Sequence, residues 1–230
     1  MILGIHVARQ LWLQLRLLVL LALPPVAALV AITVEWNAGS EAGRAALATG
    51  LAVAAVLSSA LVGAAFAEEI GSGAAAWLIV RAVPRSSLLG AWWVLPGLTV
   101  VTAFILGGVL AGLALRPPVD RVLDPVTVTV TILAAAAPAL PLTAAALAVA
   151  VDAPPRVALV ATVAGSAVLA VVLVLGGDAV IHPASGYWVV AGRAPVDQPI
   201  SVGLQAIGLC LVLSAVIWAV AARRFGSRDL

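Results

Sequence analysis

Lysine is absent from this chain of 230 residues, and all twelve of its basic residues are arginine. The P-loop of ATP-hydrolysing proteins needs a lysine to reach the bound phosphates, so the sequence contains no such ATPase site. Enzymes that form a Schiff base with their substrate also depend on a lysine amine. These absences exclude two large classes of enzyme, and we expect the chain not to be an enzyme.

Cysteine and histidine are almost as scarce. Cys210 is the only cysteine, and His6 and His182 lie near opposite ends of the sequence. A disulfide needs two cysteines, and structural metal sites usually need several cysteine or histidine ligands close together. We therefore expect no internal disulfide, no metal site and no cofactor. The net charge of +2 is small and the arginines are dispersed, so we expect no binding of nucleic acid.

Charged residues make up only 10% of the chain, whereas hydrophobic residues make up 64%. A soluble domain carries about 25% charged and about 45–50% apolar residues. A chain of this composition cannot cover itself with polar surface, and its natural solvent is lipid. The sequence therefore predicts an all-α integral membrane protein that crosses the cell membrane several times.

Six apolar runs are each long enough, at about 20 residues, to cross the hydrocarbon core as a helix. Pro138 and Pro141 are expected to kink or interrupt the fourth run. An inner loop at 68–90 separates the second run from the third, and an outer loop at 176–200 precedes the last. We treat residues 1–230 as one transmembrane domain with expected spans at 17–34, 45–67, 91–115, 126–151, 157–175 and 201–222.

The arginines predict the orientation, because the cytoplasmic loops of membrane proteins are enriched in basic residues. If both termini are cytoplasmic, eight arginines lie on the inner side and four on the outer side. The inner set is Arg9, Arg16, Arg81, Arg85, Arg156, Arg223, Arg224 and Arg228. The alternative is a cleaved signal peptide that ends near Ala31, which would leave five spans and termini on opposite sides.

The middle of each expected span lacks the Asp, Glu, Arg or His that proton-coupled transporters usually carry there. Serine and threonine supply most of the polar atoms, and their usual role is a hydrogen bond to a carbonyl or across a helix pair. The outer loop contains Tyr187 and Trp188 among apolar residues, so we expect part of it to dip into the membrane interface.

The most informative stretch is 68–85 in the inner loop, which reads EEIGSGAAAWLIVRAVPR. Its two glutamates are too costly to bury in lipid, and the Gly-Ser-Gly that follows permits a sharp turn. The apolar residues after Gly73 predict a short helix, which Pro84 ends. Such a helix at the inner interface either docks into a groove on a partner protein or merely joins two spans.

This stretch resembles the loop between the second and third spans of type-2 ABC transporter permeases, the ABC-2 family. Glu69 and Gly73 match that family's spacing from an acidic residue to a glycine. Leu78 and Ile79 match its apolar helix, and Arg85 matches its closing arginine. The tail AARRFGSRDL after the last span also resembles the basic tail of that family.

The resemblance implies a permease subunit of an ATP-driven exporter, with a lipid-like, drug-like or peptide substrate. It implies that two six-span subunits pair, and that each binds a separate ABC ATPase through a cytoplasmic coupling helix between spans two and three. On this interpretation the ATPase contacts are Glu68, Glu69, Gly73, Trp77, Leu78, Arg81 and Arg85. The alternatives are a permease like that of cytochrome-c haem export, a secondary transporter, and a membrane scaffold without an ATPase.

Overall fold

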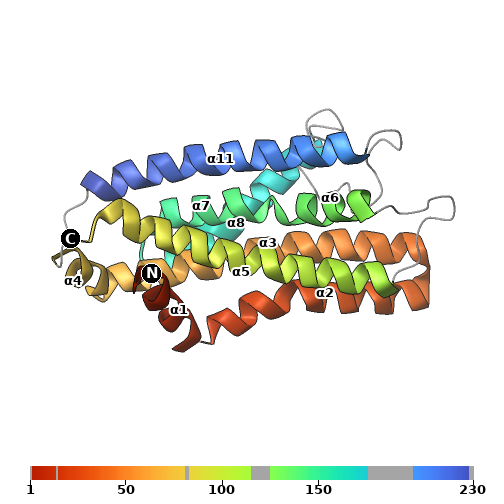
Figure 1. Ribbon diagram of the computed structural model, residues 1–230, viewed down its shortest axis with the longest axis horizontal. Helices are drawn as coiled ribbons and strands as arrows, with labels where there is room; N and C mark the ends of the chain where they lie inside the picture. Colours follow the sequence, from red (N-terminus) through yellow and green to blue (C-terminus); the bar gives the residue numbers. More distant parts are fainter. Residues whose placement is uncertain (1, 14, 81–82, 115–124, 176–198, 228–230) are drawn as a thin grey trace.

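The computed structural model describes residues 2–13, 15–80, 83–114, 125–175 and 199–227, and within them all regular secondary structure is α-helical. The long helices run side by side in an elongated bundle (Figure 1). The all-α fold expected from the sequence is therefore confirmed for the described residues. The helices are α1 (Ile2–Leu13), α2 (Arg16–Ala38), α3 (Ser40–Gly71), α4 (Ala74–Val80), α5 (Arg85–Ala114), α6 (Pro125–Ala136), α7 (Ala139–Ala150), α8 (Pro155–Leu175) and α11 (Pro199–Ser227).

Five helical stretches in the described residues are long and apolar enough to cross a membrane. They are Arg16–Ala38, Ser40–Gly71, Arg85–Ala111, Thr129–Ala150 and Gly203–Ser227. The remaining expected span corresponds to α8, which has 21 residues but is not among these five. The chain is compatible with a multi-pass membrane protein, with five candidate spans where the sequence predicted six.

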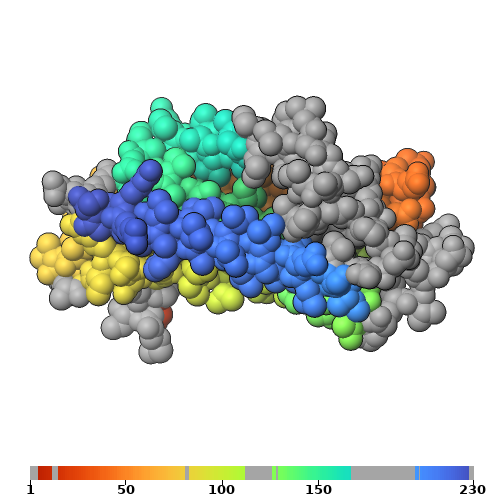
Figure 2. Space-filling model, turned by 90° about the horizontal axis from the view of Figure 1, so that it is seen from above, coloured from red at the N-terminus to blue at the C-terminus, as the bar shows by residue number. Residues whose placement is uncertain are grey.

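Large apolar side chains cover much of the outer surface of the bundle. Helix α11 lies along the face seen in Figure 2, with α5 on one side of it and α7 and α8 on the other. Its exposed side chains include Leu204, Leu211, Val212, Val216 and Val220. Soluble monomers rarely expose apolar patches of more than a few hundred Å². This face is therefore compatible with contact to lipid or to another membrane-embedded subunit.

Small residues let the long helices approach one another closely. A methyl group added at Gly63 of α3 would lie 2.9 Å from the carbonyl oxygen of Ala146 in α7. One added at Gly107 of α5 would lie 2.8 Å from the carbonyl oxygen of Pro24 in α2. Between helices in lipid the hydrophobic effect contributes little, so such backbone contacts and van der Waals packing supply the stability.

Several helices extend beyond the expected spans. The interval 35–44 separates the first two expected spans, but α2 and α3 occupy it except for the single residue Gly39, which has φ +91°. Helix α3 continues to Gly71, so both glutamates of the inner loop belong to its last turns. The Pro84 carbonyl accepts hydrogen bonds from the amides of Ser87 and Leu88, and this starts α5 well before residue 91. The inner loop is therefore shorter than the expected 68–90.

The break in the fourth expected span is confirmed, because α6 ends at Ala136 and α7 begins after Pro138. The N-terminal segment, for which no helix was expected, forms α1. Helix α1, helix α4 and the C-terminal end of α11 lie at the same end of the bundle (Figure 1). Most of the expected outer loop, 176–198, lies outside the described residues.

Candidate functional site

The stretch that the sequence singled out folds as the end of α3, a tight turn and the short helix α4. The turn depends on Gly73, whose φ of +77° lies in the left-handed region that favours glycine. The Ser72 hydroxyl donates a hydrogen bond to the carbonyl oxygen of Glu69, which satisfies one of the carbonyls left over at the helix end. The amide of Trp77 then bonds to the Gly73 carbonyl as α4 begins.

One side of helix α4 packs against the bundle, and the other side faces away from it. Ala75 and Leu78, three residues apart, are 0% and 8% exposed and hold the helix against the bundle. Trp77 and Val80, also three residues apart, are 55% and 86% exposed. Residues at this spacing share one face of a helix, so the outward side of α4 presents an aromatic and an aliphatic side chain. A surface of this kind can dock into an apolar groove.

The adjacent glutamates Glu68 and Glu69 do not simply face water. Glu69 Oε1 lies 2.9 Å from His6 Nε2, and only 2% of the Glu69 side chain is exposed. Glu68 Oε1 accepts a hydrogen bond of 2.7 Å from Arg16 Nη2. His6 belongs to α1 and Arg16 begins α2, so both carboxylates attach the N-terminal segment to the end of α3.

The junction between α1 and α2 is strained. Leu15 has φ +54° and ψ 7°, in the left-handed region that costs a residue with a Cβ atom about 1–2 kcal/mol. Such a conformation persists only where the surrounding structure holds it. The two side-chain pairs at Glu68 and Glu69 provide that restraint, because they fix α1 on one side of the junction and the start of α2 on the other.

Arg85 interacts with the other end of the chain. Its Nη1 donates hydrogen bonds to the carbonyl oxygens of Phe225 at 3.2 Å and of Gly226 at 2.9 Å, in the last turn of α11. A cation at a helix C-terminus also interacts favourably with the helix dipole. The Phe225 ring contacts Phe66, whose ring centroid lies 5.6 Å away, and Phe66 contacts Trp92 at 5.7 Å. The ends of α3, α5 and α11 are thereby joined.

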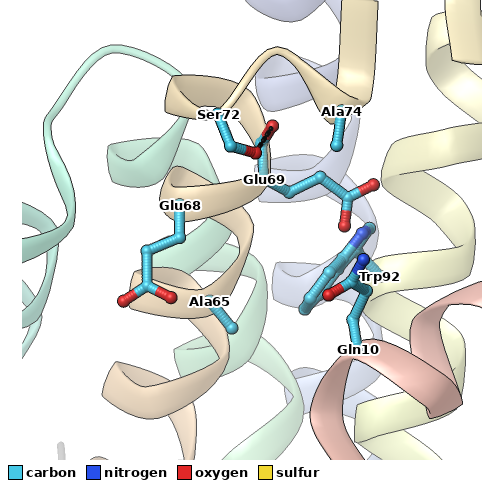
Figure 3. Close-up of a pocket in the computed structure, with 7 residues that line it drawn as sticks. All are labelled: Gln10, Ala65, Glu68, Glu69, Ser72, Ala74 and Trp92. Atoms are coloured by element: carbon cyan, nitrogen blue, oxygen red, sulfur yellow. Dashed lines mark hydrogen bonds between the residues drawn. The ribbon is translucent and has the colours of Figure 1, made fainter. Parts of the chain in front are cut away.

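Behind the turn is a cavity of about 300 Å³ between α1, α3, α4 and α5 (Figure 3). Glu69 points toward the Trp92 indole, whereas Glu68 points away from it. The indole N–H of Trp92 faces the Glu69 carboxylate. The lining residues are Gln10, Ala65, Glu68, Glu69, Ser72, Ala74 and Trp92.

Six of the seven predicted partner contacts lie in the described residues, at the end of α3, in the turn, in α4 and at the start of α5. Arg81 lies outside the described residues. Sequence reasoning missed His6 and Arg16, which are separated from their glutamates by 63 and 52 positions. The only indication of these pairs in the sequence was that a histidine and an arginine precede the first apolar run.

The described residues contain no group of three or more His, Cys, Asp or Glu side chains arranged to hold a metal ion. No protein-family model and no curated protein sequence matches the chain.

Proposed function

We propose that this chain is the membrane-spanning permease subunit of an ATP-driven exporter of the ABC-2 type. The observation that carries the proposal is the form of α4, a short helix at one end of two long apolar helices. Its Ala75 and Leu78 side is packed, whereas its Trp77 and Val80 side faces outward. On this proposal the outward side is the docking surface for a separate ATPase.

The course of the chain supports six crossings with both termini on one side. Asp152, just before α8, lies 3.9 Å from Arg224 near the C-terminal end of α11. Gly203, near the N-terminal end of α11, packs against Val130 of α6 toward the other end of the bundle. The chain between Asp152 and Gly203 therefore has to run from one end of the bundle to the other. A helix of 21 residues such as α8 is about 31 Å long, which is sufficient to cross the hydrocarbon core.

The motor would be a separate chain, because the sequence has no lysine with which to build a P-loop. A second permease subunit would cover part of the apolar surface, for which the exposed face of α11 is available. An apolar groove of about 190 Å³ between α5 and α7, beside Trp93 and Leu140, supports a lipid-like or amphipathic substrate.

The proposal is tested by co-purification of the tagged chain with an ABC ATPase encoded beside it. Trp77→Ala should reduce the recovered ATPase by about tenfold or more, because a buried tryptophan at an interface typically contributes at least about 2 kcal/mol. Val80→Asp should act in the same direction by placing a charge in the apolar contact.

Trp36→Ala is the matched control, since Trp36 is also an exposed tryptophan, at 82%, but belongs to the C-terminal end of α2, which lies at the opposite end of the bundle from α4 (Figure 1). This variant should retain the ATPase and its stimulated ATP hydrolysis. If Trp77→Ala and Trp36→Ala recover equal amounts of ATPase, α4 is not the docking surface. If the wild-type chain recovers no ABC ATPase, a secondary transporter or a scaffold becomes the better interpretation.

A further inference from the structure

The cavity behind the α3–α4 turn is large enough for a small molecule. Its volume of about 300 Å³ is roughly ten times the volume that one water molecule occupies in the liquid. Small-molecule sites in proteins begin at about this volume. A single bare ion would leave most of the space unfilled.

The chemistry of the wall indicates what such a ligand would offer. Glu69 is 5% exposed, and its Oε2 makes no hydrogen bond with any described residue. The carboxylate points into the space in front of Trp92 (Figure 3). A buried acceptor without a donor costs about 1–3 kcal/mol, and more when it carries charge. Glu69 Oε2 can therefore accept a hydrogen bond from a ligand in the cavity.

The charges around the cavity favour a positive ligand. Two carboxylates line it, and the C-terminal end of α3 adds partial negative charge from its last carbonyls. Arg16 is bound to Glu68 and does not pair with Glu69. The side-chain partner of the inward-facing Glu69 carboxylate is the imidazole of His6. The indole of Trp92 forms part of the same wall.

We propose that this cavity binds a primary ammonium group, with Glu69 Oε2 as its principal acceptor. The Gln10 side-chain carbonyl and the Ser72 hydroxyl oxygen lie along the same wall, and they accept the remaining hydrogen bonds of the ammonium group. An anion is disfavoured by the Glu69 carboxylate, which points into the cavity. A divalent metal is disfavoured because the described residues offer no cluster of three ligands.

The ammonium group has two possible sources, the ethanolamine headgroup of a phospholipid or a free amine in solution. The inference does not depend on an ATPase, because every lining residue belongs to this chain. It is tested on the purified chain alone, so a failure of this inference can be distinguished from a failure of the proposed docking function.

Native mass spectrometry of the chain in amine-free buffer and detergent measures the binding. Three probes are titrated separately: ethanolamine, dihexanoyl-phosphatidylethanolamine and dihexanoyl-phosphatidylcholine. We expect one saturable molecule of a primary-amine probe per chain and no saturable binding of the choline lipid, whose quaternary ammonium has no N–H to donate. Binding of ethanolamine identifies a free-amine site, and binding of the ethanolamine lipid alone identifies a lipid site. Equal binding of both lipids, or no binding of either amine, overturns the proposal.

Glu69→Gln should weaken the binding by about tenfold or more, because a hydrogen bond to a charged group contributes about 1.5–3 kcal/mol. Glu41→Gln, at the exposed opposite end of the same helix, is the matched control and should leave binding unchanged. His6→Gln removes the contact between α1 and Glu69 but leaves the Glu69 carboxylate in place. This variant should therefore keep most of the affinity for the amine. An equal loss in His6→Gln and Glu69→Gln would contradict the site. If Glu69→Gln does not fold, Gln10→Leu should weaken binding in its place.

Discussion

At the scale of single residues, Glu68 and Glu69 have different partners although they are adjacent. Neighbouring positions on a helix are separated by about 100°, so one carboxylate reaches Arg16 and the other reaches His6. Glu69 is nearly enclosed, whereas the Glu68 side chain is 39% exposed. A substitution at Glu69 therefore alters the cavity as well as the contact with α1, which makes it a poor test of partner docking.

Reversing the charges of the Arg16–Glu68 pair tests whether it holds the start of α2. Arg16→Glu should lower the free energy of unfolding by about 1 kcal/mol, because the pair is partly exposed and its loss places two carboxylates together. The double variant Arg16→Glu with Glu68→Arg should recover most of that loss. Thermal unfolding in detergent measures both variants. A double variant no more stable than the single one would show that the pair contributes nothing.

At the scale of helices, the stability of the bundle depends on backbone contacts between small residues. Gly63→Ala should lower the free energy of unfolding by about 1–3 kcal/mol, because the added methyl group would meet the Ala146 carbonyl in α7. Gly165→Ala in α8 is the control, since a methyl group there meets nothing within 4 Å and alanine favours the helix. Thermal unfolding that is equally affected by both substitutions would contradict close packing of α3 on α7.

The helices themselves follow from the sequence better than their ends do. Composition predicted an all-helical chain, and Pro138 predicted the break between α6 and α7. The predicted helix ends were wrong where the helix was assumed to stop at the last apolar residue. Glutamate is a good helix former, so α3 continues through Glu68 and Glu69, and the backbone of Pro84 lets α5 begin before its apolar residues.

The candidate site was predictable only in its local part. Gly73 and the apolar residues after it predicted the turn and the short helix, because both depend on neighbouring residues. The pairing of His6 with Glu69 depends on the direction of α1, and this direction depends on a left-handed Leu15. Leucine gives no indication of that conformation, so a contact across 63 positions could not be read from the sequence.

At the scale of the whole molecule, the arginine distribution and the course of the helices make one joint prediction about sidedness. We expect Ser227 at the end of α11 to lie inside the cell and Ala38 at the end of α2 to lie outside. Single cysteines at these positions, in a Cys210→Ser background, are labelled in intact cells with a membrane-impermeant maleimide. Ala38→Cys should react and Ser227→Cys should react only after lysis. Labelling of Ser227→Cys in intact cells would contradict cytoplasmic termini.

The central claim is that the outward side of α4 contacts an ATPase, and site-specific photo-crosslinking in native membranes tests it most directly. A benzophenone amino acid replaces Trp77 in one variant and Trp36 in the other. Both side chains are exposed, and α4 lies at the opposite end of the bundle from the C-terminal end of α2 (Figure 1). We predict that position 77 crosslinks to a protein with a P-loop and an ABC signature, and that position 36 does not. Crosslinks from position 77 to lipid alone, or the same ATPase crosslinked from both positions, would contradict the claim.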